Sequence, residues 1–255
     1  MSKENMIFHG DNVATMKDWP DACVDLVVTS PPYDNLRTYG GHTWDFDGVA
    51  RELTRLLKPG GVIVWVVADA TVKGSETLTS MRQAIHFKDV CGLNAHDTMI
   101  YQRPAVPFDP KCNRYWQCWE YMFVFSKGKP LCNYIKEPCK GAGKPKKGDY
   151  GQRRYDGTNR TDRHQEDRTI QETKVRENVW KYTAGDRVDG HPAQFPSLLA
   201  ADHILSWSNE GDTVLDPFAG SGTTLLAAKQ LNRHYVGIEI NEEYISIINK
   251  RLHAL

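Results

Sequence analysis

Short apolar runs alternate with longer segments of helical periodicity along most of the chain. Each run ends in a polar turn, as buried parallel strands do. Strands are predicted at residues 6–9, 24–29, 62–67, 98–102, 121–126, 213–215 and 235–240. The strands at 98–102 and 121–126 follow one another directly, which favours an antiparallel pair.

Helices are predicted between these strands. Val49, Leu53 and Leu56 are spaced for one helix face, and Lys58-Pro-Gly-Gly ends that helix. Other helices are expected at 77–90, with Leu78, Met81 and Ile85 on one side, and at 196–207, 221–231 and after Asn241. The alternation predicts an α/β fold, with a doubly wound, mostly parallel sheet that is covered on both faces and includes an antiparallel strand.

Length and composition narrow the class of protein. A chain of 255 residues has room for one α/β domain and a sizeable insertion. The longest apolar run, residues 62–68, is too short to cross a membrane, and the polar N-terminus shows no signal peptide. We therefore expect a cytoplasmic protein with reduced cysteines and no membrane partner.

The formal net charge is zero, which by itself argues against a nucleic-acid partner. The charge is unevenly distributed, however. Residues 127–163 contain eleven Lys or Arg and four Asp or Glu, a local excess of +7. This stretch is rich in Gly and lacks apolar periodicity, which predicts a basic insertion at 127–190; a solvated surface loop without a binding role is the alternative.

A Gly-rich turn at 214–224 (Val-Leu-Asp-Pro-Phe-Ala-Gly-Ser-Gly-Thr-Thr) joins a predicted strand to a helix. Gly220 and Gly222 allow a ligand to approach the backbone closely. The turn lacks the Lys of a phosphate-binding loop and the third Gly of a dinucleotide fingerprint. Glu239 ends the next strand, where a carboxylate can accept hydrogen bonds from a ribose. The pattern favours a nucleoside ligand without a pyrophosphate, and an ordinary strand–helix turn is the alternative.

Thr29-Ser-Pro-Pro-Tyr directly follows another predicted strand. The two prolines stiffen this segment and leave carbonyl oxygens without neighbouring donors. The Ser30 hydroxyl and the Pro31 carbonyl could accept the two hydrogens of a planar amino group, and Tyr33 could stack on its ring. A proline-stiffened strand exit is the alternative.

Together these motifs resemble the amino DNA methyltransferases that use S-adenosylmethionine. Asp216-Pro-Phe-Ala-Gly-Ser-Gly-Thr-Thr resembles their cofactor loop, and Ser30-Pro-Pro-Tyr resembles their catalytic tetrapeptide. The catalytic motif precedes the cofactor motif, and this order is similar to that of the permuted β-class. The resemblance implies a catalytic half at 1–126, an inserted target-recognition region at 127–190 and a cofactor-binding half at 191–255.

The resemblance also implies roles for individual residues. A base flipped out of double-stranded DNA would meet the catalytic residues Ser30, Pro31, Pro32 and Tyr33. The residues implied to bind S-adenosylmethionine are Asp11, Phe195, Pro196, Asp216, Phe218, Gly220, Gly222, Thr223 and Glu239. The arginines expected to contact DNA are Arg37, Arg153, Arg154, Arg160 and Arg163. The mechanism needs no metal.

Ser at the first tetrapeptide position resembles the cytosine-N4 enzymes, so cytosine N4 is favoured over adenine N6. Methylation of a planar nitrogen in RNA or protein and a catalytically silent DNA-binding module are the competing functions. A homodimer and a cognate restriction endonuclease are partners that such enzymes can have. The spacing of Cys112, Cys118, Cys132 and Cys139 does not match the usual zinc-ligand pairs.

Overall fold

The fold was analysed in a computed structural model, which describes residues 4–32, 44–104, 113–144, 169–182 and 196–255. Two compact units are present. The first comprises Met1–Asn133 and Asn178–Leu255, and the second comprises Tyr134–Glu177. Tyr33, Arg37, Cys112, Arg153, Arg154, Arg160, Arg163 and Phe195 lie outside the described residues.

The first unit is built on one large sheet with the strand order β1-β12-β11-β2-β3-β7-β6-β10. The first five of these are parallel to one another: β1 (Met6–His9), β12 (His234–Glu239), β11 (Thr213–Asp216), β2 (Val24–Thr29) and β3 (Leu57–Val67). The remaining three are β7 (Trp119–Ser126), β6 (Asn94–Gln102) and β10 (Val179–Lys181). Because β7 is antiparallel to both of its neighbours, the predicted mostly parallel sheet with an antiparallel strand is confirmed.

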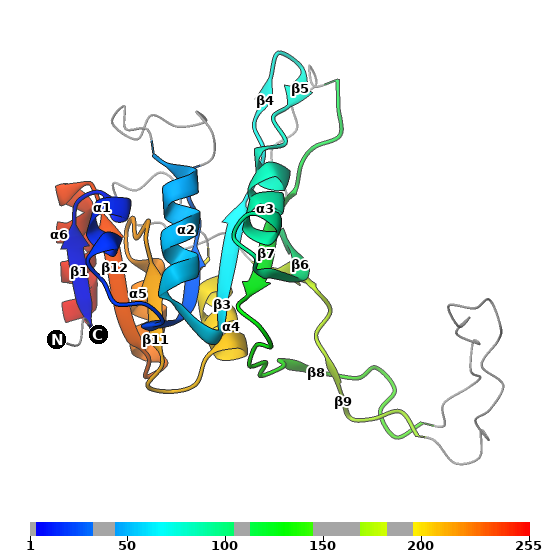
Figure 1. The fold of residues 1–255 in the computed structure, drawn as a ribbon. Coiled ribbons are helices and arrows are strands. Elements are labelled where there is room, and N and C mark those ends of the chain that lie inside the picture. Colours follow the sequence, from blue (N-terminus) through cyan, green and yellow to red (C-terminus); the bar gives the residue numbers. More distant parts are fainter. Residues whose placement is uncertain (1–3, 33–43, 105–112, 145–168, 183–195) are drawn as a thin grey trace. The chain divides into compact units, whose positions relative to one another are not determined.

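Helices cover both faces of this sheet (Figure 1). One face carries α1 (Asn12–Lys17), α2 (Phe46–Leu56) and α3 (Thr79–Asp89), and the other carries α4 (Ser197–Trp207), α5 (Thr223–Gln230) and α6 (Glu242–His253). Side chains alternate between these faces along β3: Ile63, Trp65 and Val67 pack in the core under α1–α3. Both faces are buried, which explains why residues 62–67 form an uninterrupted apolar run.

Four details differ from the sequence-based expectations. Strand β3 begins at Leu57, so Lys58-Pro-Gly-Gly lies within the strand after ending the helix. Strand β1 is at the sheet edge and is not fully buried. Strand β10 and a small hairpin of β4 (Thr71–Val72) and β5 (Ser75–Glu76) had no signal in the sequence pattern.

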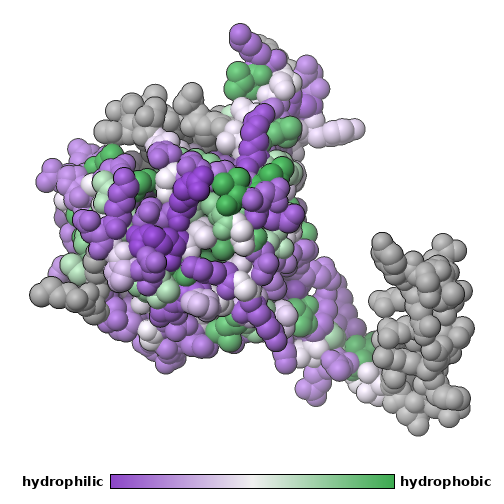
Figure 2. Space-filling model, in the orientation of Figure 1, coloured by the Kyte–Doolittle hydropathy of each residue, from purple (hydrophilic) through white to green (hydrophobic). Residues whose placement is uncertain are grey.

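The fourth difference concerns helix α3. Its buried residues are Ser80, Gln83 and Phe87, because the Trp65 indole donates a 2.9 Å hydrogen bond to Gln83 Oε1 and Phe87 enters the aromatic core. Leu78, Met81 and Ile85 are exposed. Figure 2 shows that hydrophobic residues lie among hydrophilic ones on the face that it views.

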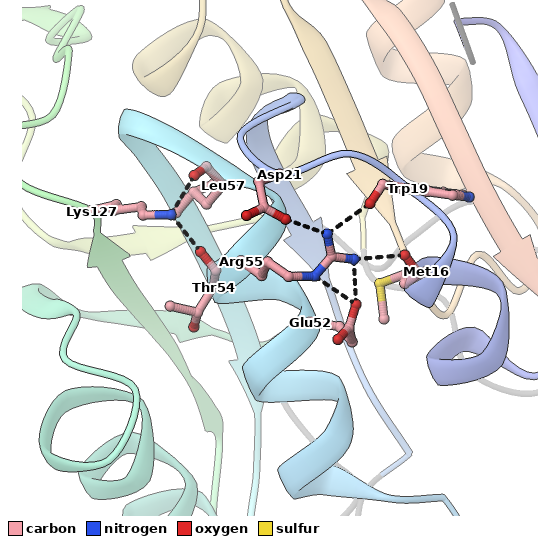
Figure 3. Close-up of polar contacts among 8 residues, drawn as sticks. All are labelled: Met16, Trp19, Asp21, Glu52, Thr54, Arg55, Leu57 and Lys127. Atoms are coloured by element: carbon pink, nitrogen blue, oxygen red, sulfur yellow. Dashed lines mark hydrogen bonds and ion pairs between the residues drawn. The ribbon is translucent and has the colours of Figure 1, made fainter. Parts of the chain in front are cut away.

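Hydrogen bonds of Arg55 and Lys127 stabilise the C-terminal end of α2 (Figure 3). This end is remote from the carboxyl ends of the parallel strands. The Arg55 guanidinium donates to the carbonyls of Met16 and Trp19 and to the carboxylates of Asp21 and Glu52. Lys127 Nζ donates 2.9 Å hydrogen bonds to the carbonyls of Thr54 and Leu57, which end the helix. Lys127 therefore belongs to the scaffold, although it contributes to the local positive excess in the sequence.

The second unit contains an antiparallel pair, β8 (Lys136–Pro138) and β9 (Thr173–Val175). Arg176 Nε is 2.9 Å from Glu137 Oε1, and Lys174 Nζ is 2.6 Å from Glu177 Oε1. Lys136, Lys140 and Lys144 add positive charge to this unit. No helix within the described ranges has the length and apolar character needed to traverse a membrane.

Candidate cofactor and catalytic site

The Gly-rich turn lies between β11 and α5, as the sequence predicts. Gly220 and Gly222 have φ values of +54° and +83°, a backbone conformation that L side chains rarely adopt. A Cβ on Gly222 would also lie 3.0 Å from Ile248 Cγ1 of helix α6. The turn therefore needs glycine here both for its backbone angle and for the close approach of α6.

Glu239 ends β12 and faces this turn. Its Oε2 accepts a 2.7 Å hydrogen bond from the Gly220 N–H, and its Oε1 accepts one of 2.9 Å from the Asn241 N–H. Partial burial raises the pKa of the Glu239 carboxyl, and these backbone donors oppose the rise. The carboxylate is thus held in a defined orientation beside the Gly-rich turn.

Asp11 follows β1, the strand next to β12 in the sheet. His9 pairs with Glu239 in the register of these strands, and the Gly10 N–H donates to the Glu239 carbonyl at 3.0 Å. Asp11 caps helix α1, with its Oδ1 2.8 Å from the Ala14 nitrogen. Asp11 and Glu239 are therefore brought to the same edge of the sheet, although they are far apart in sequence.

Asn12 is a site neighbour that the sequence pattern does not indicate. Its side chain is buried, and its amide donates a 3.2 Å hydrogen bond to the Pro217 carbonyl in the Gly-rich turn. This contact ties the start of α1 to the turn. A lone Asn after an Asp cap has no distinguishing pattern, so only the tertiary structure reveals the contact.

Asp216 is only 2% exposed, at the end of β11. Its Oδ1 accepts hydrogen bonds from Thr29 Oγ1 at 2.7 Å and from the Phe218 N–H at 3.1 Å. Burial raises its pKa to about 6, despite the opposing effect of these donors. The carboxylate faces the end of β2.

The tetrapeptide begins where β2 ends. Thr29 is the last residue of β2, and β2 lies between β11 and β3 in the sheet. Ser30 and Pro32 are half-buried and Pro31 is buried. Since β2 and β11 are adjacent and parallel, the tetrapeptide and the Gly-rich turn leave the sheet at the same edge.

Three other predicted cofactor residues are described: Phe218 and Thr223 belong to the turn itself, and Pro196 lies at the start of α4. The Phe218 ring packs edge-on against Trp44, with ring centroids 5.0 Å apart. Pro196 is buried and immediately precedes helix α4, and Thr223 is the buried first residue of α5. Phe218 thus joins the Gly-rich turn to the aromatic core under α2. No group of three or more His, Cys, Asp or Glu side chains is placed to hold a metal in the described part of the chain.

Comparison with known proteins identifies the family that this arrangement belongs to. Residues 24–250 match the N6/N4 methyltransferase family, described as DNA methylase. The chain belongs to this DNA methylase family. Its sequence is 50% identical to the orphan methyltransferase M.BamHII of Bacillus amyloliquefaciens over 243 residues, which cover 91% of this chain and 89% of the relative.

Solved structures share this fold. The DNA methylase is similar to the cytosine-N4-specific PvuII DNA methyltransferase, with a TM-score of 0.73, 20% identity and coverage of 98% of this chain and 87% of the other. It is also similar to a putative DNA modification methylase of Thermus thermophilus in complex with S-adenosyl-L-methionine. That match has a TM-score of 0.64, 25% identity and coverage of 98% and 93%. The predicted methyltransferase fold is confirmed.

Proposed function

We propose that this DNA methylase transfers a methyl group from S-adenosylmethionine to the exocyclic N4 of a cytosine flipped out of duplex DNA. The observation that carries the proposal is the position of two motifs at one sheet edge. The tetrapeptide follows β2 and the Gly-rich turn follows the adjacent β11. A nucleophile-binding segment and a cofactor-binding segment must be neighbours for direct transfer.

The donor and acceptor chemistry of the turn fits S-adenosylmethionine. Residues 214–224 contain no Lys or Arg, so the turn suits a sulfonium cation better than a pyrophosphate. The Glu239 carboxylate would accept hydrogen bonds from the ribose hydroxyls, and Asp11 would lie on the adenine side. The other residues proposed to bind the cofactor are Phe195, Pro196, Phe218, Gly220, Gly222 and Thr223. Asp216 would support this set through its hydrogen bonds to Thr29 and Phe218. When bound, the cofactor would supply an electrophilic methyl group. The new N–C bond would form as the S–CH3 bond breaks, S-adenosylhomocysteine would leave, and the amino nitrogen would release one proton to water.

The tetrapeptide would prepare the amino nitrogen for the reaction. The lone pair of an exocyclic amine is delocalised into its ring, which makes the nitrogen a weak nucleophile. Hydrogen bonds from the amino group to Ser30 Oγ and to the Pro31 carbonyl would favour a tetrahedral nitrogen and orient its lone pair. Pro32 would keep the segment stiff, and Tyr33 would stack on the flipped base.

The neutral Ser30 hydroxyl supports cytosine as the target base, since Ser at this position resembles the cytosine-N4 enzymes. Adenine N6 is the second candidate, because the family as a whole includes both reactions. Mass spectrometry of nuclease-digested product DNA separates 4-methylcytosine from 6-methyladenine. A product containing only 6-methyladenine would contradict the cytosine assignment.

The decisive assay is radiolabelled methyl transfer to unmethylated duplex DNA, compared with RNA and protein acceptors. We expect label in DNA alone. Ser30→Ala should lower kcat by about 10- to 1,000-fold, because it removes one acceptor that orients the nucleophile. Thr54→Val, on helix α2, is the control. Labelling of RNA or protein alone would reject the DNA substrate, and no labelling would favour a catalytically silent module.

The basic insertion at 127–190 follows the catalytic half at 1–126 and precedes the cofactor-binding half at 191–255. We propose that it recognises the target sequence in DNA. Arginine can bind guanine through two hydrogen bonds in the major groove. Arg153, Arg154, Arg160 and Arg163 are the proposed DNA contacts, with Arg37 next to the tetrapeptide. Unchanged DNA affinity after all four insertion arginines are replaced with Ala would refute their assignment.

Three further properties accompany this function. A cytoplasmic location remains a prediction. A homodimer remains a prediction that light scattering can test. A cognate restriction endonuclease also remains a prediction, and its test is whether methylation by this protein protects DNA from an endonuclease encoded beside it.

A further inference from the structure

A single buried oxygen connects the two motifs of the proposed active site. Asp216 Oδ1 accepts the Thr29 hydroxyl at 2.7 Å and the Phe218 N–H at 3.1 Å. Thr29 immediately precedes Ser30, and Phe218 lies within the Gly-rich turn. The two donors are therefore anchored on the catalytic segment and on the cofactor segment, which are remote in sequence.

Burial makes this connection well defined. Thr29 is 0% exposed and Asp216 is 2% exposed, so water does not compete strongly for their hydrogen bonds. A second hydrogen bond joins the same two segments. Thr224 Oγ1, at the start of α5, donates to the Val28 carbonyl in β2 at 3.1 Å. The end of β2 is thus held to the cofactor segment by both a side chain and its own backbone.

The choice of a carboxylate at this place also needs an explanation. Burying an acid costs free energy, as the raised pKa of Asp216 shows. The strands β2 and β11 already pair through their backbones, and the Thr224 hydroxyl is a further donor that stabilises the charged form of Asp216. A charged acceptor forms shorter and stronger hydrogen bonds than a neutral one, so it restricts the positions of both donors more tightly.

We propose that Asp216 and Thr29 form a positioning pair that sets the Ser30-Pro31 segment against the cofactor turn for methyl transfer. This inference rests on the proposed function. Neither residue needs to touch a substrate, because the pair acts through the next residue, Ser30. Misplacement of reacting groups by about 1 Å can cost about 100-fold in rate, so a loss of the link should appear mainly in kcat.

The test compares Thr29→Val, which keeps the shape but lacks the hydroxyl, with Thr29→Ser, which keeps the hydroxyl. Thr54→Val is the matched control, since the Thr54 hydroxyl donates to the Ala50 carbonyl within α2. We expect Thr29→Val to lower kcat by about 10- to 100-fold, with KM for DNA and Kd for S-adenosylmethionine changed by less than about threefold. Thr29→Ser and the control should keep kcat within about threefold of the wild type.

A second readout does not depend on activity. Hydrogen–deuterium exchange of the segment 24–32 in the cofactor-free protein should be faster in Thr29→Val than in the wild type, and unchanged in the control. Asp216→Asn provides a further variant if Thr29→Val does not fold. It keeps an acceptor oxygen but loses the charge, so we expect an intermediate, about three- to tenfold, loss of kcat.

The outcomes separate the pair from the proposed function. A wild-type protein that methylates no acceptor would reject the function and, with it, the role of the pair. An active wild type with normal kcat and normal exchange in Thr29→Val, or normal kcat in Asp216→Asn, would overturn the pair alone. Equal losses in Thr29→Val and Thr29→Ser would also overturn it, because the hydroxyl would then not be the group that matters.

Discussion

Replacing Asp216 with Asn is expected to change how the free energy of unfolding depends on pH. The pKa of Asp216 rises from 3.8 to about 6 in the folded protein because the carboxyl is buried. Between these values the native state binds the proton more tightly than the unfolded state does, so native stability decreases as pH rises. Each tenfold change in proton affinity is worth about 1.4 kcal/mol, so the full cost of the buried charge is about 3 kcal/mol above pH 6.

The side chain introduced by Asp216→Asn would carry no charge at any pH. The wild type should therefore lose about 2 kcal/mol relative to this variant between pH 4.5 and pH 7.5. Any pH-independent effect of the substitution, such as an unpaired amide hydrogen, cancels in this comparison. Other titrating groups, including Glu239 with its raised pKa, occur in both proteins and largely cancel as well.

Urea unfolding of both proteins across this pH range measures the difference directly. Asp18→Asn, at an exposed residue after α1, is the control for replacing an Asp with an Asn. A difference between Asp216→Asn and the wild type that stays constant with pH would refute the reasoning. So would one of opposite sign, because Asp216 would then be stabilised as a charged group in the folded protein.

Three other predictions concern single side chains. Lys127→Met should lower the free energy of unfolding by about 2 kcal/mol in urea titrations, because it removes two charge-assisted hydrogen bonds at the end of α2; a change in the KM for DNA without loss of stability would contradict this role. Glu239→Gln should weaken binding of S-adenosylmethionine by about tenfold or more in calorimetry, since a neutral amide is a poorer acceptor for ribose hydroxyls, and unchanged affinity would exclude Glu239 from the site. His203→Leu should reduce acid sensitivity, because burial lowers the pKa of His203 to about 3 and the native state loses stability as pH falls below about 6.5. Between pH 7.5 and pH 5, the free energy of unfolding of the wild type should fall by about 2 kcal/mol relative to that of this variant. A difference in unfolding free energy that is the same at both pH values would contradict this prediction.

Most strands and helices of the first unit could be predicted because their signals are local. The apolar runs at 24–29 and 62–67 became β2 and β3, and Asn241 caps α6 as expected. The strand–turn–helix pattern of the Gly-rich turn was also correctly predicted. These features depend on neighbouring residues and on backbone preferences that a single sequence contains.

The buried face of α3 could not be predicted in the same way. Leu78, Met81 and Ile85 have the spacing of a core face, yet they are exposed, while Gln83 is buried. The reason is tertiary: the Trp65 indole needs an acceptor within the core, and Gln83 supplies it. Hydrophobic spacing does not include such a partner from another element.

The sequence by itself determined the fold class, the two motifs and their order along the chain. It also placed both motifs directly after strands, because turns and helix starts have local signatures. Only the tertiary structure decided that one Asp216 oxygen joins Thr29 to Phe218, and that Lys127 caps a helix of the scaffold. Thr29 and Asp216 are 187 positions apart, and their hydrogen bond depends on the order of the strands in the sheet. The partners of the Lys127 charge depend on the same order. No local sequence pattern contains that information.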